Sequence, residues 1–280
     1  MLSRRGAADH RRHLPGHDHS GDAMSITTPA LTVERATGST GARVRGVDLN
    51  AVDDATFDVI RKALLQHGVV HLPGQDVTPA AHKAFGERFG ELHTHPAAPG
   101  VEGHPEILLL ENRGKSRTIT EVWHSDVSCE AKPPAISILA ARTLPDAGGD
   151  TMWANQYLAY DRLSDGMKAM LGGLRAVHMA FGLEAVHPVV RTHPENGRKA
   201  LFVNGGFTSH FEGMTKAESK PLLDYLVAFA SAPDLIYRHR WTAGDVVLWD
   251  NRSVMHFAVH DYDDQHRVMH RVTVAGDEPR

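Results

Sequence analysis

The sequence predicts a mainly β protein, a sandwich or jelly roll decorated with helices. Two observations favour this class: six short β-rich segments follow residue 105, most of them bounded by Gly, Pro, Asp or Asn, and only four helical patterns accompany them. Neither an internal repeat nor the strand–helix alternation of a parallel sheet is present, so repeat and doubly wound folds are disfavoured.

The first elements are two helices with a strand between them. Residues 53–66 place apolar side chains at helical spacing, and Gly68 is a suitable stop. Residues 78–90 open with a Thr-Pro pair, an N-cap followed by proline at the first helical position. Between these helices, residues 69–72 form an apolar run typical of a buried strand.

Strands dominate the remainder of the chain. They are expected over residues 107–110, 135–140, 151–154, 200–204, 246–249 and 267–274. Two helices interrupt them. One is expected over residues 156–171, and the other begins at Thr215, where Thr215 and Glu218 form a capping box, and runs toward Phe229.

The N-terminal segment differs in composition from the rest of the chain. Residues 1–24 carry four Arg and four His without hydrophobic periodicity, which predicts a disordered tail. Met24 is an alternative candidate for the start of translation. No apolar signal region follows Arg4 and Arg5, so we expect a cytoplasmic protein. Residues 25–280 are expected to form one domain.

Charge and apolar content exclude several classes of partner. The chain of 280 residues has 30 Lys+Arg and 34 Asp+Glu, a net charge of −4, so no attraction to nucleic acid or anionic membrane is expected. No apolar run approaches the roughly 18 residues of a transmembrane helix.

Any metal site in this chain must use nitrogen and oxygen ligands, because the sequence holds 20 His but a single Cys. No His or Asp is placed to activate Cys129, so thiol catalysis is rejected. His124 and Asp126 stand at i and i+2, which project to one side of an extended chain. This pair alone is a weak signal. With His256 it would form the two-His, one-carboxylate set that is diagnostic of non-haem Fe(II) oxygenases.

Two arginines share one face of the strand expected over residues 267–274. Arg267 and Arg271 alternate with valines that face the other way, and they lie about 13 Å apart at strand rise. The Val-rich face is typical of a core, whereas a planar guanidinium suits carboxylates and other anions. The pair could hold two acidic groups in one cavity; the alternative is an ordinary exposed strand face.

With these residues in place, the sequence resembles the taurine dioxygenase family of Fe(II)/2-oxoglutarate-dependent oxygenases. The resemblance covers residues 33–279. It rests on the segments 89–96, 123–126, 148–151, 187–194, 249–252 and 269–271. It implies a double-stranded β-helix (a cupin-like jelly roll) and hydroxylation of an organic substrate with release of succinate and CO2. It also implies a homo-oligomer, a dimer or a tetramer.

The resemblance also implies roles for particular residues. Fe(II) would be held by His124, Asp126 and His256, and O2 would be the second co-substrate. The distal carboxylate of 2-oxoglutarate would meet Arg267 and Thr151. The positions that match the family's substrate pocket are Arg271, His95, Phe207, Thr120 and Val127.

Three departures from the family pattern bear on the substrate. Thr120 stands where the taurine enzyme carries an Asn, Ala98 stands where it carries a Tyr, and the segment 178–187 is shorter than its lid loop. These changes disfavour taurine. Since Arg271 is retained, we expect an anionic substrate: a sulfonate, a sulfate ester or a carboxylate.

Two other classes of function stay open at this point. A metal-dependent hydrolase would also accept His and carboxylate ligands, and it predicts activity without O2 or 2-oxoglutarate. A non-catalytic jelly-roll binding module would keep the fold but predicts missing ligands, and the sequence retains the whole set.

Overall fold

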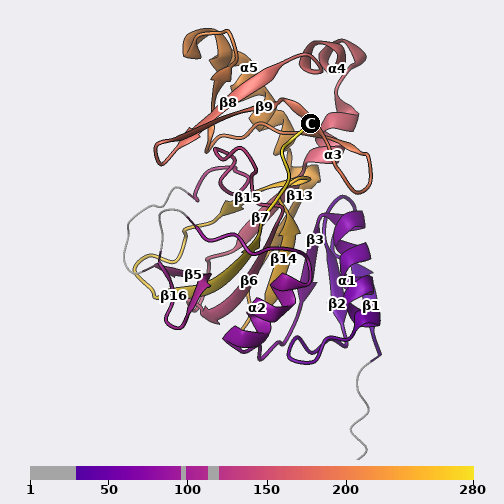
Figure 1. Ribbon diagram of the computed structural model, residues 1–280, viewed down its shortest axis with the longest axis vertical. Helices are drawn as coiled ribbons and strands as arrows, with labels where there is room; N and C mark the ends of the chain where they lie inside the picture. Colours follow the sequence, from indigo (N-terminus) through magenta and orange to yellow (C-terminus); the bar gives the residue numbers. More distant parts are fainter. Residues whose placement is uncertain (1–29, 96–98, 113–119) are drawn as a thin grey trace, which may run out of the picture.

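A large mixed sheet forms the centre of the molecule (Figure 1). The computed structural model describes residues 30–95, 99–112 and 120–280, so the predicted tail and Ala98 lie outside the described residues. In spatial order, the eight strands of this sheet are β1 (Thr32–Arg35), β2 (Ala42–Arg45), β3 (Val69–Leu72), β14 (Val246–Asp250), β6 (Ile136–Thr143), β16 (Arg267–Val274), β5 (His104–Asn112) and β4 (Gly100–Val101).

Three smaller sheets complete the β structure. They consist of β13 (Ile236–His239), β7 (Thr151–Asn155) and β15 (Val254–Ala258); of β12 (Thr208–Phe211), β8 (Arg175–Ala180) and β9 (Leu183–Pro188); and of β10 (Val190–Thr192) and β11 (Lys199–Leu201). Among the described strands, β2 and β3 are the one parallel pair, and a helix joins them.

The helices lie outside the sheets. They are α1 (Asp54–His67), α2 (Pro79–Glu87), α3 (Gln156–Arg162), α4 (Asp165–Leu171), α5 (Lys216–Ala230) and a 3-10 turn at Pro233–Leu235. Asp53, Thr78 and Thr215 cap α1, α2 and α5 through their side chains, and Gly68 ends α1 in the left-handed conformation. These four helix boundaries therefore agree with the sequence.

The alternation of side chains along the strands builds two cores. Val246 and Leu248 of β14 face α1 and α2, whereas Val247 and Trp249 face the sheet of β13, β7 and β15. The same alternation puts Val272 of β16 in the outer core, as the valine pattern predicts. The predicted jelly roll is thus confirmed: two sheets enclose an interior, and helices cover the outer face of the larger one (Figure 1).

The prediction of one helix over residues 156–171 is wrong. Leu163 and Ser164 are extended and divide the segment into α3 and α4, and the Ser164 side chain accepts from the Met167 amide as the N-cap of α4. The strand expected over residues 200–204 is also shorter, since β11 ends at Leu201.

The segment 178–187, which the sequence indicates to be short, lies within a β-hairpin. Strands β8 and β9 pair with Ala180 opposite Leu183, so the turn has only two residues, Phe181 and Gly182. Both have positive φ, 54° and 76°, as a type I′ turn requires. This hairpin and α5 gather at the end of the molecule opposite α2 (Figure 1).

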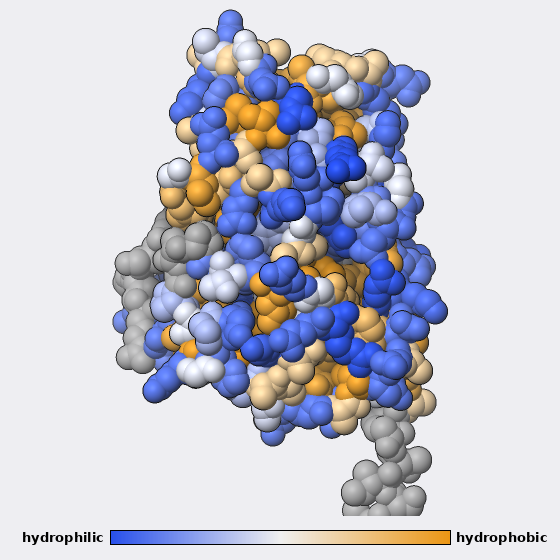
Figure 2. Space-filling model, viewed as in Figure 1, coloured by the Kyte–Doolittle hydropathy of each residue, from blue (hydrophilic) through white to orange (hydrophobic). Residues whose placement is uncertain are grey.

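The face seen in Figure 2 is largely hydrophilic with separate small apolar areas. Within the described residues, no helix has both the length and the apolar character needed to cross a membrane.

Candidate functional site

A short antiparallel bridge brings His124 and His256 face to face. The His124 amide donates to the His256 carbonyl at 3.0 Å, and the His256 amide donates to the His124 carbonyl at 2.7 Å; the two imidazole centroids lie 4.0 Å apart. His256 Nε2 lies 3.8 Å from Asp126 Oδ1. One ligand atom from each of these residues lies within 4.8 Å of the others, so the structure brings the three predicted ligands together.

Hydrogen bonds from neighbouring groups orient two of these side chains, His124 and Asp126. His124 Nδ1 donates to the Val122 carbonyl at 2.8 Å, which leaves Nε2 as the free lone pair. Asp126 Oδ2 accepts from Ser137 Oγ at 2.6 Å, and Ser137 accepts from Asn251 Nδ2 at 3.0 Å. Oδ2 of the carboxylate is therefore held by two side chains, Ser137 and Asn251, that do not line the cavity.

Electrostatics favour the protonation states that metal ligands require. Burial, reinforced at His256 by its neighbour His124, lowers the pKa of both imidazoles, so both are neutral at pH 7. Burial alone would raise the pKa of Asp126, but the neighbouring Arg271 guanidinium holds it well below its usual range. Two neutral imidazoles and one carboxylate fit Fe(II) or another divalent transition metal.

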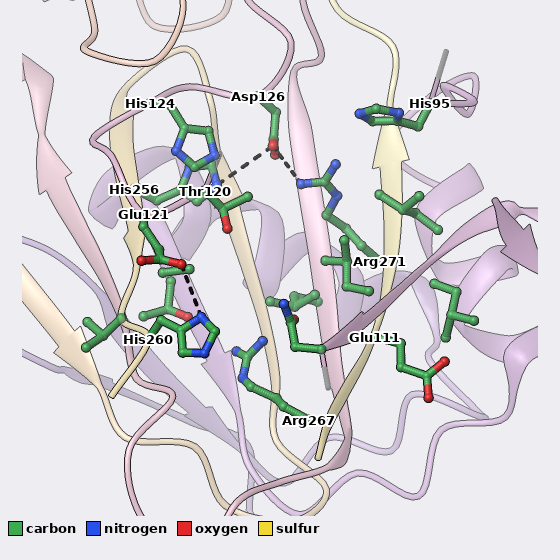
Figure 3. A pocket seen from close by; sticks show the side chains of 18 of the residues that line it. His95, Glu111, Thr120, Glu121, His124, Asp126, His256, His260, Arg267 and Arg271 are labelled. Carbon is green, nitrogen blue, oxygen red and sulfur yellow. Dashed lines mark hydrogen bonds and ion pairs between the residues drawn. The ribbon is translucent and has the colours of Figure 1, made fainter. Parts of the chain in front are cut away.

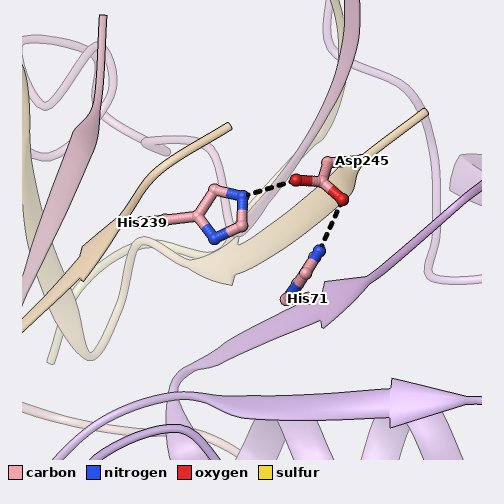
Figure 4. A group of neighbouring side chains, drawn as sticks. All are labelled: His71, His239 and Asp245. Carbon is pink, nitrogen blue, oxygen red and sulfur yellow. Dashed lines mark hydrogen bonds and ion pairs between the residues drawn. The ribbon is translucent and has the colours of Figure 1, made fainter. Parts of the chain in front are cut away.

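A second cluster of His and carboxylate groups, shown in Figure 4, has a different character. Asp245 Oδ1 lies 2.8 Å from His71 Nε2, and Oδ2 lies 3.1 Å from His239 Nε2 while accepting from the Thr242 hydroxyl. Arg43 Nε donates to His71 Nδ1, so Nε2 of His71 carries the proton and donates to Asp245. These groups satisfy one another, and we assign them to structure rather than to metal.

The three predicted ligands border a cavity of about 370 Å³ inside the barrel (Figure 3). All ten predicted site residues line it: His95, Thr120, His124, Asp126, Val127, Thr151, Phe207, His256, Arg267 and Arg271. The two arginines of β16 line the cavity from one strand face, so this face is not solvent-exposed, and Met269 between them packs in the apolar core beside the sheet of β13, β7 and β15.

One end of the cavity is formed by Arg267 and Thr151. The Arg267 side chain is buried, and its guanidinium makes no hydrogen bond or ion pair to any residue that the structure describes. Its side chain crosses Gly149, where an added Cβ would lie 3.1 Å from Nε. The Thr151 hydroxyl oxygen accepts from Trp241 Nε1 at 3.0 Å, which leaves the Thr151 proton free to donate. These donors favour an anionic ligand.

The other end combines Arg271 with apolar walls. Arg271 Nη1 donates to Asp126 Oδ1 at 2.6 Å. Val127 and Phe207 pack together in a small apolar cluster, and the Phe181 ring contacts both Phe207 and His95 edge-on. This end of the cavity therefore offers one guanidinium beside a largely hydrophobic surface.

Sequence reasoning missed several residues of the cavity wall, among them Phe181 and His260. Phe181 lies at the hairpin tip, and its signal was the Phe-Gly pair within the short segment 178–187. His260 lies four residues after His256, beyond the end of β15, and no spacing rule singles it out. His270 lies on the face of β16 opposite the two arginines, where its Nδ1 accepts from Arg142 Nε, and it does not line the cavity.

Fold and site together define a jelly-roll enzyme with a two-histidine, one-carboxylate centre, and comparison with known proteins makes this specific. Residues 32–273 match the family model described as taurine catabolism dioxygenase TauD, TfdA family. The chain therefore belongs to the TauD/TfdA family, and it is a 2-oxoglutarate-dependent dioxygenase.

Among the relatives, an alkylsulfatase of Acinetobacter baylyi is 35% identical over 89% of this chain and 86% of its own length. An alpha-ketoglutarate-dependent sulfate ester dioxygenase of Pseudomonas putida is 34% identical, with 89% and 91% covered. The crystal structure of a taurine dioxygenase from Burkholderia xenovorans superposes with a TM-score of 0.83 at 38% identity, covering 90% of this chain and 91% of that one. A crystal structure of AAD-2 in complex with Mn(II) and N-oxalylglycine has a TM-score of 0.77 at 28% identity, covering 89% of this chain and 99% of that one.

Proposed function

We propose that this enzyme hydroxylates a small anionic organic substrate with Fe(II) held by His124, Asp126 and His256. The observation that carries the proposal is that these side chains lie in one cavity between two buried arginines, Arg267 and Arg271. One cationic end would take the co-substrate 2-oxoglutarate and the other the substrate. The two guanidiniums could therefore hold two acids in the same cavity as the metal site.

Iron bound by this set would supply oxygen activation coupled to loss of CO2 from 2-oxoglutarate, which leaves succinate and converts a substrate C–H bond to C–OH. The protein's own contribution is orientation. Ser137 and Asn251 fix the Asp126 carboxylate, and the Val122 carbonyl fixes the tautomer of His124. The complex of AAD-2 with Mn(II) and N-oxalylglycine supports a divalent metal and an oxo-dicarboxylate ligand in this fold.

The co-substrate end has the donors that a carboxylate needs. Arg267 offers a guanidinium that forms no ion pair with the described residues, and Thr151 offers a hydroxyl proton whose direction is set by the Trp241 indole. The two donors would hold the distal carboxylate of 2-oxoglutarate. The low exposure of both side chains excludes water from this contact, which strengthens it.

At the substrate end we favour a sulfate ester over taurine. Arg271 suits a sulfate group, and the apolar side chains of Val127, Phe181 and Phe207 suit an alkyl or aryl portion better than an ammonium group. Relatives named as an alkylsulfatase and as a sulfate ester dioxygenase support the same substrate class. Hydroxylation of the carbon next to the ester oxygen would let the C–O bond break, releasing sulfate and leaving a carbonyl compound.

Substrate-dependent turnover tests the proposal directly. The protein is loaded anaerobically with Fe(II) and 2-oxoglutarate, mixed with one compound from a panel of alkyl sulfates, sulfonates including taurine, and aryloxy acids, and then exposed to O2. We expect succinate and inorganic sulfate in equal amounts with an alkyl sulfate, and little succinate with taurine. Sulfate release without O2 or 2-oxoglutarate would contradict the oxygenase mechanism and support the hydrolase alternative.

Two further expectations stay predictions. A homo-oligomer, a dimer or a tetramer, is tested by size-exclusion chromatography with light scattering. A cytoplasmic location is tested by cell fractionation.

A further inference from the structure

The side chain of His260 is buried in the cavity wall without a use in the chemistry described above. It is 9% exposed, stacks on the Tyr262 ring at 4.5 Å between centroids, and has Nδ1 3.1 Å from Glu121 Oε1. Nε2 is buried and has no hydrogen-bond partner among the described residues. A buried polar atom in this state is costly unless a ligand completes it.

The backbone places His260 at the Arg267 end of the cavity. Ala258 pairs with Thr151 across β15 and β7, and the Val259 amide donates to the Asp150 carbonyl at 2.9 Å, so His260 directly follows this contact. Both His260 and Arg267 line the cavity. In Figure 3 the Nε2 side of the His260 ring faces Arg267, while Nδ1 faces Glu121.

From this arrangement we infer that His260 is a third binding residue for the distal carboxylate of 2-oxoglutarate. The inference deepens the proposed function and rests on it. The Glu121 carboxylate accepts from Nδ1–H, and Nε2–H then donates to one carboxylate oxygen of the ligand while Arg267 and Thr151 hold the other. A carboxylate has enough acceptor positions for all three donors.

The test compares 2-oxoglutarate with 2-oxopentanoate, which has the same chain but lacks the distal carboxylate. His260→Phe keeps the ring stack on Tyr262 and removes both nitrogens. Each compound is titrated calorimetrically into Mn(II)-loaded protein, so no turnover is needed. We expect the Kd of 2-oxoglutarate to rise about 10- to 100-fold, the loss typical of one charge-assisted hydrogen bond, while the Kd of 2-oxopentanoate stays unchanged.

A matched control variant at His266 and a separate variant at Arg267 distinguish the possible outcomes. His266 pairs with Glu111 at 2.8 Å but is 38% exposed and does not line the cavity, so His266→Phe is expected to bind both compounds normally. Unchanged 2-oxoglutarate binding in His260→Phe, or an equal loss for both compounds, would overturn the inference. If Arg267→Ala also binds 2-oxoglutarate normally, the proposed co-substrate site itself is wrong; if only Arg267→Ala weakens binding, His260 alone is misassigned.

Discussion

Arg271 donates from Nη1 to Asp126 Oδ1 at 2.6 Å, and both side chains are buried in the cavity wall. The arginine proposed to meet the substrate thus also contacts a proposed metal ligand and holds its pKa down. Ser137 engages the second carboxylate oxygen. Charge at the substrate end and charge at the metal site are therefore coupled through one carboxylate.

The Ser137 hydroxyl is expected to contribute to metal affinity without touching the metal. In Ser137→Ala, Asp126 Oδ2 loses its donor, and we expect Fe(II) affinity to fall about 10- to 100-fold, the usual effect of losing such an orienting group. Anaerobic metal titration measures it. Ser231→Ala removes a hydroxyl at the end of α5 and serves as the control. Equal affinity in Ser137→Ala and wild type would show that this contact does not orient the ligand.

Two variants at the co-substrate end are expected to weaken 2-oxoglutarate binding to different extents. Arg267→Ala removes the charged partner of a buried carboxylate, and we expect half-saturation by 2-oxoglutarate to rise about 100-fold. Trp241→Phe removes the donor that directs the Thr151 hydroxyl but leaves Arg267 in place, and an increase of about 2- to 10-fold is expected. Initial rates of succinate formation measure both. If Arg267→Ala is half-saturated at the same 2-oxoglutarate concentration as wild type, the co-substrate site must lie elsewhere.

Phe181 is expected to limit substrate length. Its φ of 54° disfavours a bulky side chain, whereas Asn tolerates this conformation, so Phe181→Asn opens the cavity without lowering the free energy of unfolding. We expect kcat/KM for long alkyl sulfates to rise relative to short ones. Leu183→Asn, on the same hairpin but outside the cavity lining, is the control. An unchanged length profile in Phe181→Asn would argue against this role.

Because His82 is buried, we expect the folded protein to lose stability in acid. Burial lowers the pKa of His82 to about 3, and its Nε2 donates to the Ile138 carbonyl while Nδ1 has no partner among the described residues. Because the unfolded chain takes up this proton near pH 6.5 and the folded chain does not, the free energy of unfolding falls as the pH drops from about 6.5 toward 3.

The matched variant His82→Gln retains a donor for the Ile138 carbonyl but does not titrate. Urea unfolding is measured between pH 4 and 6. We expect the free energy of unfolding of the variant to change with pH less steeply than that of wild type, by about 1.4 kcal/mol per pH unit, which corresponds to one proton. Equal slopes for the two proteins would mean that His82 is protonated in the folded state.

Local sequence rules predicted the parts of the site that depend on strand period and on familiar motifs. Arg267 and Arg271 alternate with valines along β16, and the structure places them inside the barrel as that period requires. The i, i+2 spacing of His124 and Asp126 likewise brings both to one side. The caps of α1, α2 and α5 were predictable because capping depends on two or three neighbouring residues.

The remainder depends on contacts between distant segments. The sequence of residues 156–171 is compatible with one long helix or with two short ones. The break at Ser164 could therefore not be predicted from this segment alone. His71, His239 and Asp245 come from three separate segments, and His260 gains significance only from the cavity that it borders. No pattern within a single segment predicts that residues from distant segments come together in space.

Succinate formation by Asp126→Ala tests the central claim most directly. Wild type and variant are loaded with Fe(II), 2-oxoglutarate and the best substrate of the panel, and succinate is measured after exposure to O2. Because Asp126 is the one carboxylate in the proposed centre, the variant is expected to form no succinate above a metal-free control, with its far-UV circular dichroism unchanged. Full turnover by Asp126→Ala would contradict the assignment of this cavity as the iron site.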